Sequence, residues 1–440
     1  MKTLTAVVAL MFLFSSNILA EDVQTLDSFI EEALTSNPQI KAARAGAESS
    51  AKRPSQEGSL PNPIIGGRIK NVSFSEFTLG EDPRSDIQAF IAQEIPFPGK
   101  LSQKEKIALE ESESQKWVAD AVSRKVVAEL KEAYYEWAFI NKSIEITQRN
   151  KDLLKSFVKI AEVKYEVGLG IQQDVLKAQV ELSGFIERLE LLNQKNEIIE
   201  ARIKKILNRP YESQIGNPEE LTKPELGASL EDITQAASLN SPELKSSQEL
   251  IDSREEALKL ADKEYLPDFI LGATYFNRSG GDLEDIWQLS LGLRVPLYFW
   301  RKEKFGVQEA ALDVTEAREN YEAARNNVLF ILKDNFISAR TAENLTELYK
   351  EGIIPQSTLS LESAISSYQV GEIDFLTLLN NLITLFNFEL EYYEQLATFN
   401  KSLARIEEVT GIDLTLSNPL GTGDNTSITQ EAGGQNDGDR

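Results

Sequence analysis

The side chains on which most enzymes and metal sites depend are missing from this chain. It contains no His and no Cys, and its two Met residues are Met1 and Met11. The usual general bases and thiol nucleophiles are therefore absent, as are the ligands that hold zinc and soft metal ions. No glycine-rich, phosphate-binding loop occurs, and no pair of acids stands out among the many carboxylates. We expect no catalytic residue, no cofactor and no bound metal.

The charge balance also restricts the partners. With 70 acidic and 46 basic residues, the formal net charge is −24. Such a surface is repelled by nucleic acid phosphates, so we expect no nucleic acid partner, and it would favour cations near any pore. Because the chain has no Cys, it forms no disulfide, and the compartment has to be inferred from the amino terminus.

Residues 1–20 are typical of a secretory signal peptide that is cleaved on export. Lys2 precedes an apolar run over 6–14, and Ala20 closes an approximate cleavage site. A retained membrane anchor is the alternative, but the apolar run is too short to span a bilayer. After this segment no stretch has eighteen consecutive apolar residues, so no membrane-spanning helix is expected.

The rest of the chain states one pattern twice, about 203 residues apart. Asn37-Pro38 is echoed by Ser241-Pro242, and Leu60-Pro61 by Leu266-Pro267. Each unit is expected to run short helix, two strands, very long helix, tight turn and returning helix. A unit of this kind cannot bury its own apolar face, so the pattern favours assembly with further copies.

The long helices are predicted from an extended lack of helix breakers. No Gly or Pro occurs between Leu101 and Val167, and apolar residues recur there at spacings of three and four. At about 1.5 Å per residue, such a helix extends roughly 100 Å. In the second unit, Gly352 and Pro355 are expected to interrupt or kink the helix. Paired helices of this length are also typical of a simple coiled coil, and that interpretation stays open.

Two segments before each long helix alternate between apolar and polar residues. The clearest is 286–296, where Trp287, Leu289 and Leu291 share one face and Gln288 and Ser290 the other. Segments of about ten residues with this alternation are typical of transmembrane β-strands, although each alone also fits a half-buried sheet. Aromatic residues near the strand ends would form interfacial girdles; these are Phe74, Phe77, Phe276, Tyr298, Phe299 and Trp300.

These patterns divide the chain into two repeats. The first repeat is expected over 21–210, with strands at about 62–73 and 86–96 and a helical hairpin at about 100–207. A linker over 211–229 separates it from the second repeat, 230–413. That repeat has strands at about 267–277 and 286–296 and a hairpin at about 300–410. The acidic tail, 414–440, loses its apolar residues and is expected to be disordered.

Four membrane strands per chain cannot close a barrel, and an open sheet edge in lipid leaves backbone groups unpaired. Three chains would supply twelve strands, an even number in the known range, whereas the eight strands of a dimer would be too narrow. We therefore expect a mainly α protein with membrane β-structure. It would be a homotrimer with a 12-stranded β-barrel in the outer-membrane lipid, continued by a long periplasmic α-helical barrel.

In this plan the chain resembles the TolC-like outer-membrane channel proteins of tripartite efflux and secretion systems. The resemblance is carried by Leu60-Pro61-Asn62-Pro63, by Gln93-Glu94-Ile95-Pro96 with Gly99-Lys100, and by the paired turns Tyr165-Glu166-Val167-Gly168 and Tyr368-Gln369-Val370-Gly371. It covers about 26–413, and no single motif is highly specific, but their order and duplication are. The first two motifs look most like the heavy-metal efflux branch, which works with RND-type pumps.

The resemblance implies a passive duct that performs no chemistry. Its periplasmic tip would dock a periplasmic adaptor protein and, through it, an inner-membrane RND-type pump. The implied adaptor-docking residues lie in the two tip turns and are Val167, Gly168, Leu169, Gly170, Val370, Gly371 and Glu372. Turns that merely join two helices are the alternative for these residues.

The family commonly narrows its pore with acidic rings just past the tip turns. Asp174 matches that position in the first repeat, whereas the second repeat has Thr377 there and its acid, Asp374, three residues earlier. Asp174 is thus the stronger candidate for the periplasmic constriction. Asp374 is the weaker one, because an acid at a helix amino terminus complements the helix dipole. For Asp174 the alternative is a solvated carboxylate on a helix face.

A different class of protein also accounts for part of the pattern. A periplasmic coiled-coil adaptor or structural rod would explain the long helices, but not four alternating strands at equivalent places. The transported substrate, metal ion or organic compound, is not readable from the chain, because the selectivity of such a system usually lies in its pump.

Overall fold

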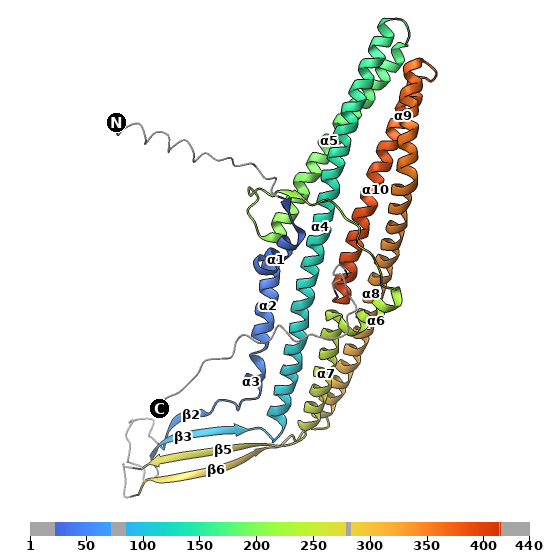
Figure 1. The fold of residues 1–440 in the computed structure, drawn as a ribbon. Helices are drawn as coiled ribbons and strands as arrows, with labels where there is room; N and C mark the ends of the chain where they lie inside the picture. The colour runs from blue at the N-terminus through green and yellow to red at the C-terminus, as the bar shows by residue number, and fades with distance from the viewer. Residues whose placement is uncertain (1–22, 72–84, 279–282, 413, 415–440) are drawn as a thin grey trace, which may run out of the picture.

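The computed structural model describes residues 23–71, 85–278, 283–412 and 414. The expected signal peptide, Phe74, Phe77 and all of the tail except Leu414 lie outside these residues. The molecule is elongated, with a β-sheet at one end and a helical shaft that runs to two hairpin tips at the other (Figure 1).

Each repeat begins with more than the single short helix expected from its sequence. The first has α1 (Leu26–Ser36), α2 (Pro38–Ser50) and α3 (Arg53–Glu57), and the second has α6 (Leu230–Asn240) and α7 (Pro242–Lys263). The break falls at the repeated Pro, because Pro cannot donate a backbone hydrogen bond to the preceding turn but is accepted at the start of a helix. Asn37 caps the restarted helix by accepting from the amides of Gln39 and Ile40.

The helical hairpins form the shaft. In the first repeat α4 (Lys100–Glu166) is one helix of 67 residues, and α5 (Gln172–Leu207) returns beside it. In the second, α8 (Glu303–Leu348) is followed by the π-helical segment η1 (Tyr349–Ile353), then by α9 (Ile354–Val370) and the returning α10 (Phe375–Thr410). No described helix is long and apolar enough to cross a bilayer.

The π-helical segment lies where Gly352 and Pro355 interrupt the second long helix. It adds one residue to the helical turn, and this shifts the register between the repeats. Below it, buried Val126, Leu130, Trp137 and Ile140 correspond to buried Val328, Leu332, Ala339 and Ala342, each 202 positions later. Above it, buried Val158 and Ala161 correspond to Leu361 and Ala364, 203 positions later. Both repeats therefore present the same core face along the whole shaft.

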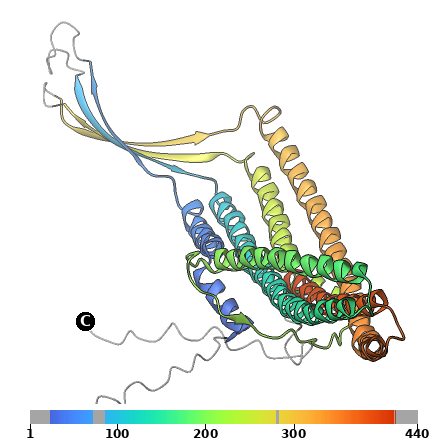
Figure 2. The same ribbon diagram turned by 90° about the horizontal axis from the view of Figure 1, so that it is seen from above.

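The sheet combines both repeats. Strands β2 (Ile64–Lys70), β3 (Asp86–Ile95), β5 (Asp268–Asn277) and β6 (Ile286–Arg294) pair antiparallel in that order. The central pairing joins the repeats, with Ile91 opposite Ala273 and Gln88 opposite Phe276. Seen from above, the strands project away from the shaft to one side (Figure 2). A separate pair, β1 (Val23–Gln24) with β4 (Asn217–Pro218), fixes the linker beside the first repeat.

The sheet has one apolar and one mixed face, as its register shows. Ile65, Ile91, Ala273 and Leu289 form one row across the four strands on the apolar face. Phe276 was predicted to belong to an interfacial aromatic girdle, but it does not lie on this face. Phe276 pairs with Gln88 and Ile286, so it lies on the opposite face, whereas its neighbour Tyr275 lies on the apolar face and packs against Trp287, with ring centroids 5.1 Å apart.

Three apolar clusters hold the shaft together. One lies near the sheet-distal tips and includes Leu154, Ala178, Leu361 and Leu382 from four helices of both hairpins. A second gathers α1, α2, α4 and α5 around Trp137, which stacks on Phe29 at a centroid distance of 6.3 Å. The third is its counterpart around α6, α8 and α10. The first cluster spans both repeats, so the two hairpins form one unit near the tips.

Candidate functional site

The tips of the two helical hairpins are built alike. At the first turn the amide of Leu169 donates to the carbonyl of Lys164 at 2.8 Å, and the amide of Gly168 donates to Tyr165 at 3.0 Å. The second turn repeats both bonds, from Glu372 to Ser367 and from Gly371 to Tyr368. This is the Schellman arrangement, which requires a left-handed residue after the helix. Gly168 and Gly371 supply it, with φ of 75° and 82°.

The tip turns carry exposed apolar side chains. Val167 is 62% exposed, Leu169 77% and Val370 73%. Glu372 is also exposed, whereas Gly170 is half-buried, and a Cβ at this position would lie 3.3 Å from the Cβ of Lys164. Apolar side chains this exposed at the end of a long shaft are a surface without a partner in the isolated chain.

The structure gives the two candidate acids different roles at the tip. Asp374 caps α10, because its Oδ1 accepts from the amide of Thr377 at 2.7 Å. Hydrogen bonds from the Thr377 side chain and then its amide hold the pKa of Asp374 below its usual value. Asp174 lies within the first turn of α5, whose own cap residue, Ile171, offers no side-chain acceptor.

Asp174 and Asp374 lie close enough for their charges to interact. Burial raises the pKa of Asp174 above the ordinary carboxyl value, and the negative charge of Asp374 raises it further. Asp174 in turn contributes, after burial, to a raised pKa of Tyr368. The fold thus brings together two acids that are separated by about 200 residues in the sequence.

A lysine that sequence reasoning missed joins the two tips. The Lys164 ammonium donates to the Tyr368 carbonyl at 2.5 Å and lies 3.9 Å from the centroid of the Tyr368 ring. The same ring packs edge-on against Phe375 at the start of α10. Lys164 therefore connects α4 of the first hairpin to α9 of the second, through a tyrosine that also packs against α10. Nothing in the sequence distinguishes it from other helix lysines.

A second missed lysine joins the repeats where the sheet meets the shaft. Lys100 is 2% exposed. Its Nζ donates to Asp268 Oδ1 at 2.9 Å, to the Leu266 carbonyl at 3.0 Å and to Glu264 Oε2 at 3.2 Å. The Phe97 amide also donates to Asp268. This junction fixes the direction in which α4 leaves β3 relative to β5. In the sequence, Gly99-Lys100 is part of a family motif, but nothing in it predicts these contacts.

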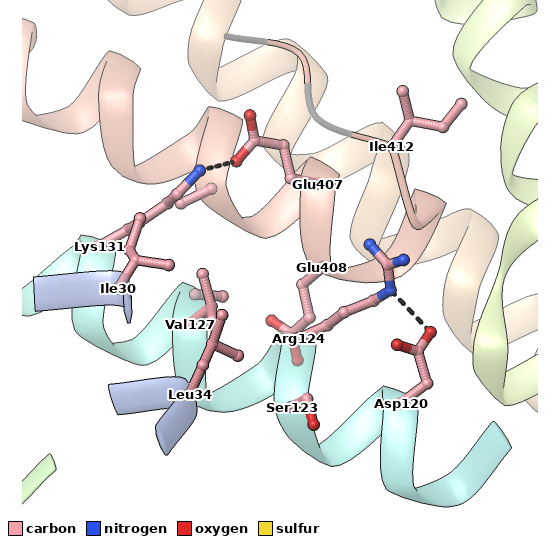
Figure 3. Close-up of a pocket in the computed structure, with 12 residues that line it drawn as sticks. Ile30, Leu34, Asp120, Ser123, Arg124, Val127, Lys131, Glu407, Glu408 and Ile412 are labelled. Atoms are coloured by element: carbon pink, nitrogen blue, oxygen red, sulfur yellow. Dashed lines mark hydrogen bonds and ion pairs between the residues drawn. The ribbon is translucent and has the colours of Figure 1, made fainter. Parts of the chain in front are cut away.

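Halfway along the shaft, a cavity of about 270 Å³ opens between α1, α4 and α10 (Figure 3). Its wall contains two ion pairs, Lys131 with Glu407 at 2.6 Å and Arg124 with Asp120 at 2.9 Å. Apolar side chains of Ile30, Leu34 and Val127 complete it (Figure 3). The acids here are paired with cations, so the cavity offers neither a free general base nor a metal ligand set. Among the described residues, no group of acids is placed to hold a metal ion.

Comparison with known proteins identifies this architecture. The outer membrane efflux protein family matches residues 29–209 and 233–411, one match for each repeat. The chain is 25% identical over 222 residues to Toxin and drug export protein A of Aggregatibacter actinomycetemcomitans. That alignment covers 48% of this chain and 47% of the relative, so the chain spans about half the length of the curated relative it matches.

Solved structures share the fold at low sequence identity. The outer membrane protein VceC of Vibrio cholerae matches with a TM-score of 0.76 and 15% identity, over 88% of this chain and 96% of VceC. The outer membrane channel MtrE of Neisseria gonorrhoeae matches with a TM-score of 0.74 and 15% identity, over 89% of each chain. The resemblance predicted from the sequence motifs is therefore confirmed, and so is the mainly helical fold with a small sheet. The chain belongs to the outer membrane efflux protein family, the TolC-like channels.

Proposed function

We propose that this protein is the passive outer-membrane duct of a tripartite efflux system. The observation that carries the proposal is the sheet, which has an exposed apolar face, a mixed face and two unpaired edges. Trp287, Leu289 and Leu291 are 72%, 83% and 70% exposed on the apolar face. A sheet of this kind is stable when lipid covers the apolar face and further strands cover the edges.

Three chains satisfy both requirements. Within the described residues, β2 and β6 each pair with a single strand, so every chain brings two free edges. Three copies joined edge to edge form a closed barrel of twelve strands, with the apolar face toward lipid and the mixed face toward a water-filled lumen. The helices would continue this barrel for about 100 Å into the periplasm, given 1.5 Å per residue in α4. A signal peptide in residues 1–20 is the proposed export signal.

The hairpin tips are the proposed docking surface for a periplasmic adaptor and, with it, an inner-membrane RND-type pump. The exposed Val167, Leu169 and Val370 supply the apolar contacts, and the glycines of the two turns set the shape. If these turns only reversed the chain, the three apolar side chains would stay exposed to water with no partner to cover them. Truncating them to Ser should abolish adaptor binding and leave the trimer intact.

Asp174 is the proposed constriction residue, whereas Asp374 caps α10. Three copies of Asp174 around the channel axis would attract cations and resist anions. Asp174→Ala should raise leak conductance or weaken cation preference in planar bilayers. Unchanged conductance and selectivity would remove Asp174 from the constriction.

The exported substrate is a separate proposal. The Leu60-Pro61-Asn62-Pro63 and Gln93-Glu94-Ile95-Pro96 motifs favour heavy-metal cations, whereas the curated relative is named for toxin and drug export. Sensitivity of a deletion strain to divalent metals, compared with dyes and antibiotics, distinguishes the two. Sensitivity to organic compounds alone would reject the metal substrate and leave the duct in place.

A coiled-coil adaptor or rod is the competing function. It accounts for the shaft but leaves the apolar face of the sheet exposed to water. Membrane fractionation separates the two proposals, because a barrel sediments with outer membranes and needs detergent. Full solubility in plain buffer would overturn the duct.

A further inference from the structure

Within the sheet, the two repeats of one chain meet along β3 and β5, and that contact shows how one copy meets the next. In the chain, β3 of the first repeat pairs with β5 of the second, and Lys100 at the start of α4 is buried against the segment before β5. The second repeat has the same elements in β6 and α8, but they face the open edge of the sheet. The following inference rests on the proposed trimer and specifies its contacts.

The register of the shaft identifies the counterparts of the buried junction residues. Below the π-helical segment the repeats are offset by 202 positions, which also matches buried Ala108 with Ala310 and buried Ser112 with Val314. Lys302 is therefore the counterpart of Lys100, and Phe305 the counterpart of Gln103, which is 4% exposed. In the isolated chain the Lys302 side chain is 85% exposed and Phe305 58%. The same two positions are thus buried in one repeat and exposed in the other.

The strands define the complementary segment. Leu60-Pro61 of the first repeat corresponds to Leu266-Pro267 of the second, which makes Asn62 the counterpart of Asp268. The sheet agrees with this offset, because Ile65 and its counterpart Leu271 lie on the apolar face. Leu60 and Asn62 are exposed in the isolated chain. Both halves of the second junction are therefore present and exposed, one at each edge of the sheet. In the isolated chain the Lys302 ammonium lies 3.8 Å from the carboxylate of its neighbour Glu303.

We propose that neighbouring protomers join by repeating the internal junction. The Lys302 ammonium of one protomer donates to the Leu60 carbonyl and the Asn62 Oδ1 of the next, and Phe305 is buried beside them. Strand β6 follows β3 by 200 positions and β5 follows β2 by 206, because Ile65 opposite Ile91 in the first repeat matches Leu271 opposite Leu291 in the second. With these offsets, β6 pairs antiparallel with β2 of the neighbour in the register of β3 and β5. Leu293 lies opposite Ile65, Leu291 opposite Gly67 and Leu289 opposite Ile69.

The junction between protomers is chemically weaker than the internal one. Lys100 meets two carboxylates, Glu264 and Asp268, whereas their counterparts in the first repeat are Gly58 and the neutral Asn62. A lysine bound by neutral acceptors lacks the charge-assisted bonds that make such contacts strong. Restoring the acid with Asn62→Asp should therefore strengthen the trimer, which a merely exposed asparagine would not do.

Cysteine cross-linking tests the register, and the absence of native Cys makes it clean. In one chain Ile65 lies on the edge strand opposite Leu293, three strand spacings across and four residues along, roughly 19 Å apart and too far for a disulfide. Oxidation of Leu293→Cys/Ile65→Cys should therefore link different protomers. Ser290→Cys/Arg68→Cys samples the other face and the other kind of cross-strand pair. Leu293→Cys/Gly67→Cys is the control displaced by two residues, and preferential linking of this control would overturn the register.

Variants at the shaft test the Lys302 contact. Lys302→Gln and Phe305→Ala should lower the temperature at which the detergent-solubilised trimer dissociates on a gel. Lys304→Gln is the matched control, because Lys304 and its counterpart Ser102 are both exposed. Asn62→Asp should raise that temperature in the parent and lose its effect in Lys302→Gln.

The outcomes separate this inference from the proposed function. If the parent is a trimer but Lys302→Gln dissociates at the same temperature as Lys304→Gln, and Asn62→Asp has no effect, the junction is wrong and the channel stands. A parent that is monomeric in detergent would overturn the trimer itself. Cross-linking in the stated register, together with an Asn62→Asp gain that needs Lys302, supports the junction.

Discussion

Replacing Lys100 by Met tests how the two repeats are held together. The change keeps the length of the side chain but removes an ammonium group whose side chain is 3% exposed. Asp268, whose side chain is 15% exposed, loses its cation and keeps the hydrogen bond from the Phe97 amide. Removing one partner of a buried ion pair costs about 3–5 kcal/mol. Glu264 is 46% exposed and adds little, so we expect a loss near the lower limit, about 3 kcal/mol.

The assay is urea unfolding of the detergent-solubilised protein, followed by far-ultraviolet circular dichroism. Glu264→Gln is the control for a half-exposed partner and should lose less than about 1 kcal/mol. Asp268→Asn combined with Lys100→Met should lose clearly less than the sum of the two single changes, because the buried charge without a partner is then gone. If Lys100→Met costs under about 1 kcal/mol and the double variant is additive, the ion pair does not hold the junction.

Three further perturbations probe the sheet, the tips and the constriction. Leu289→Lys on the apolar face should cost about 2–4 kcal/mol in a bilayer and reduce outer-membrane yield; Gln288→Lys on the mixed face should be tolerated, and equal yields would contradict the assignment of faces. Gly371→Ala should destabilise the tip by about 1–2 kcal/mol, because its φ is left-handed. Gly184→Ala is the control, because Gly184 lies within α5 with open space around it and should stabilise the protein by up to about 1 kcal/mol. If thermal unfolding shows that both variants are destabilised, the left-handed φ of Gly371 is not the cause. The pKa of Asp174 is raised in the folded protein, so its protonation favours the fold. As the pH falls through this pKa, which lies above the ordinary carboxyl value, the tip should gain stability and the channel should lose its preference for cations. Asp374→Asn should move this midpoint to lower pH, and a midpoint that stays unchanged in bilayer titrations would show that the two acids do not interact.

Much of the architecture was predictable because it depends on local periodicity. The lack of Gly and Pro after Leu101 predicts α4, and the alternation in 286–296 predicts β6, since each pattern reports only on neighbouring residues. The interruption at Gly352 and Pro355 was predictable for the same reason. That it is a π-helical segment, which shifts the core register by one residue, follows only from the packing of both repeats.

Phe276 shows the limit of local patterns. Alternation along a strand predicts two faces, but an aromatic side chain at the end of a strand is compatible with either face. The pairing of Phe276 with Gln88 decided its face. Similarly, the acid positions after the turns favoured Asp174 over Asp374, but their interaction required two hairpins to meet.

The amino-acid sequence by itself determined the repeated plan, the exclusion of His and Cys chemistry and the family, because these depend on composition and order along the chain. Tertiary structure alone decided that Lys164 reaches Tyr368 and that Lys100 reaches Asp268. Each of these contacts joins residues more than 160 positions apart, and their formation depends on the packing of two repeats against each other. The sequence of a single repeat does not show which residues of the other repeat will lie beside it. Lysines that look alike in the sequence therefore make different contacts in the folded protein.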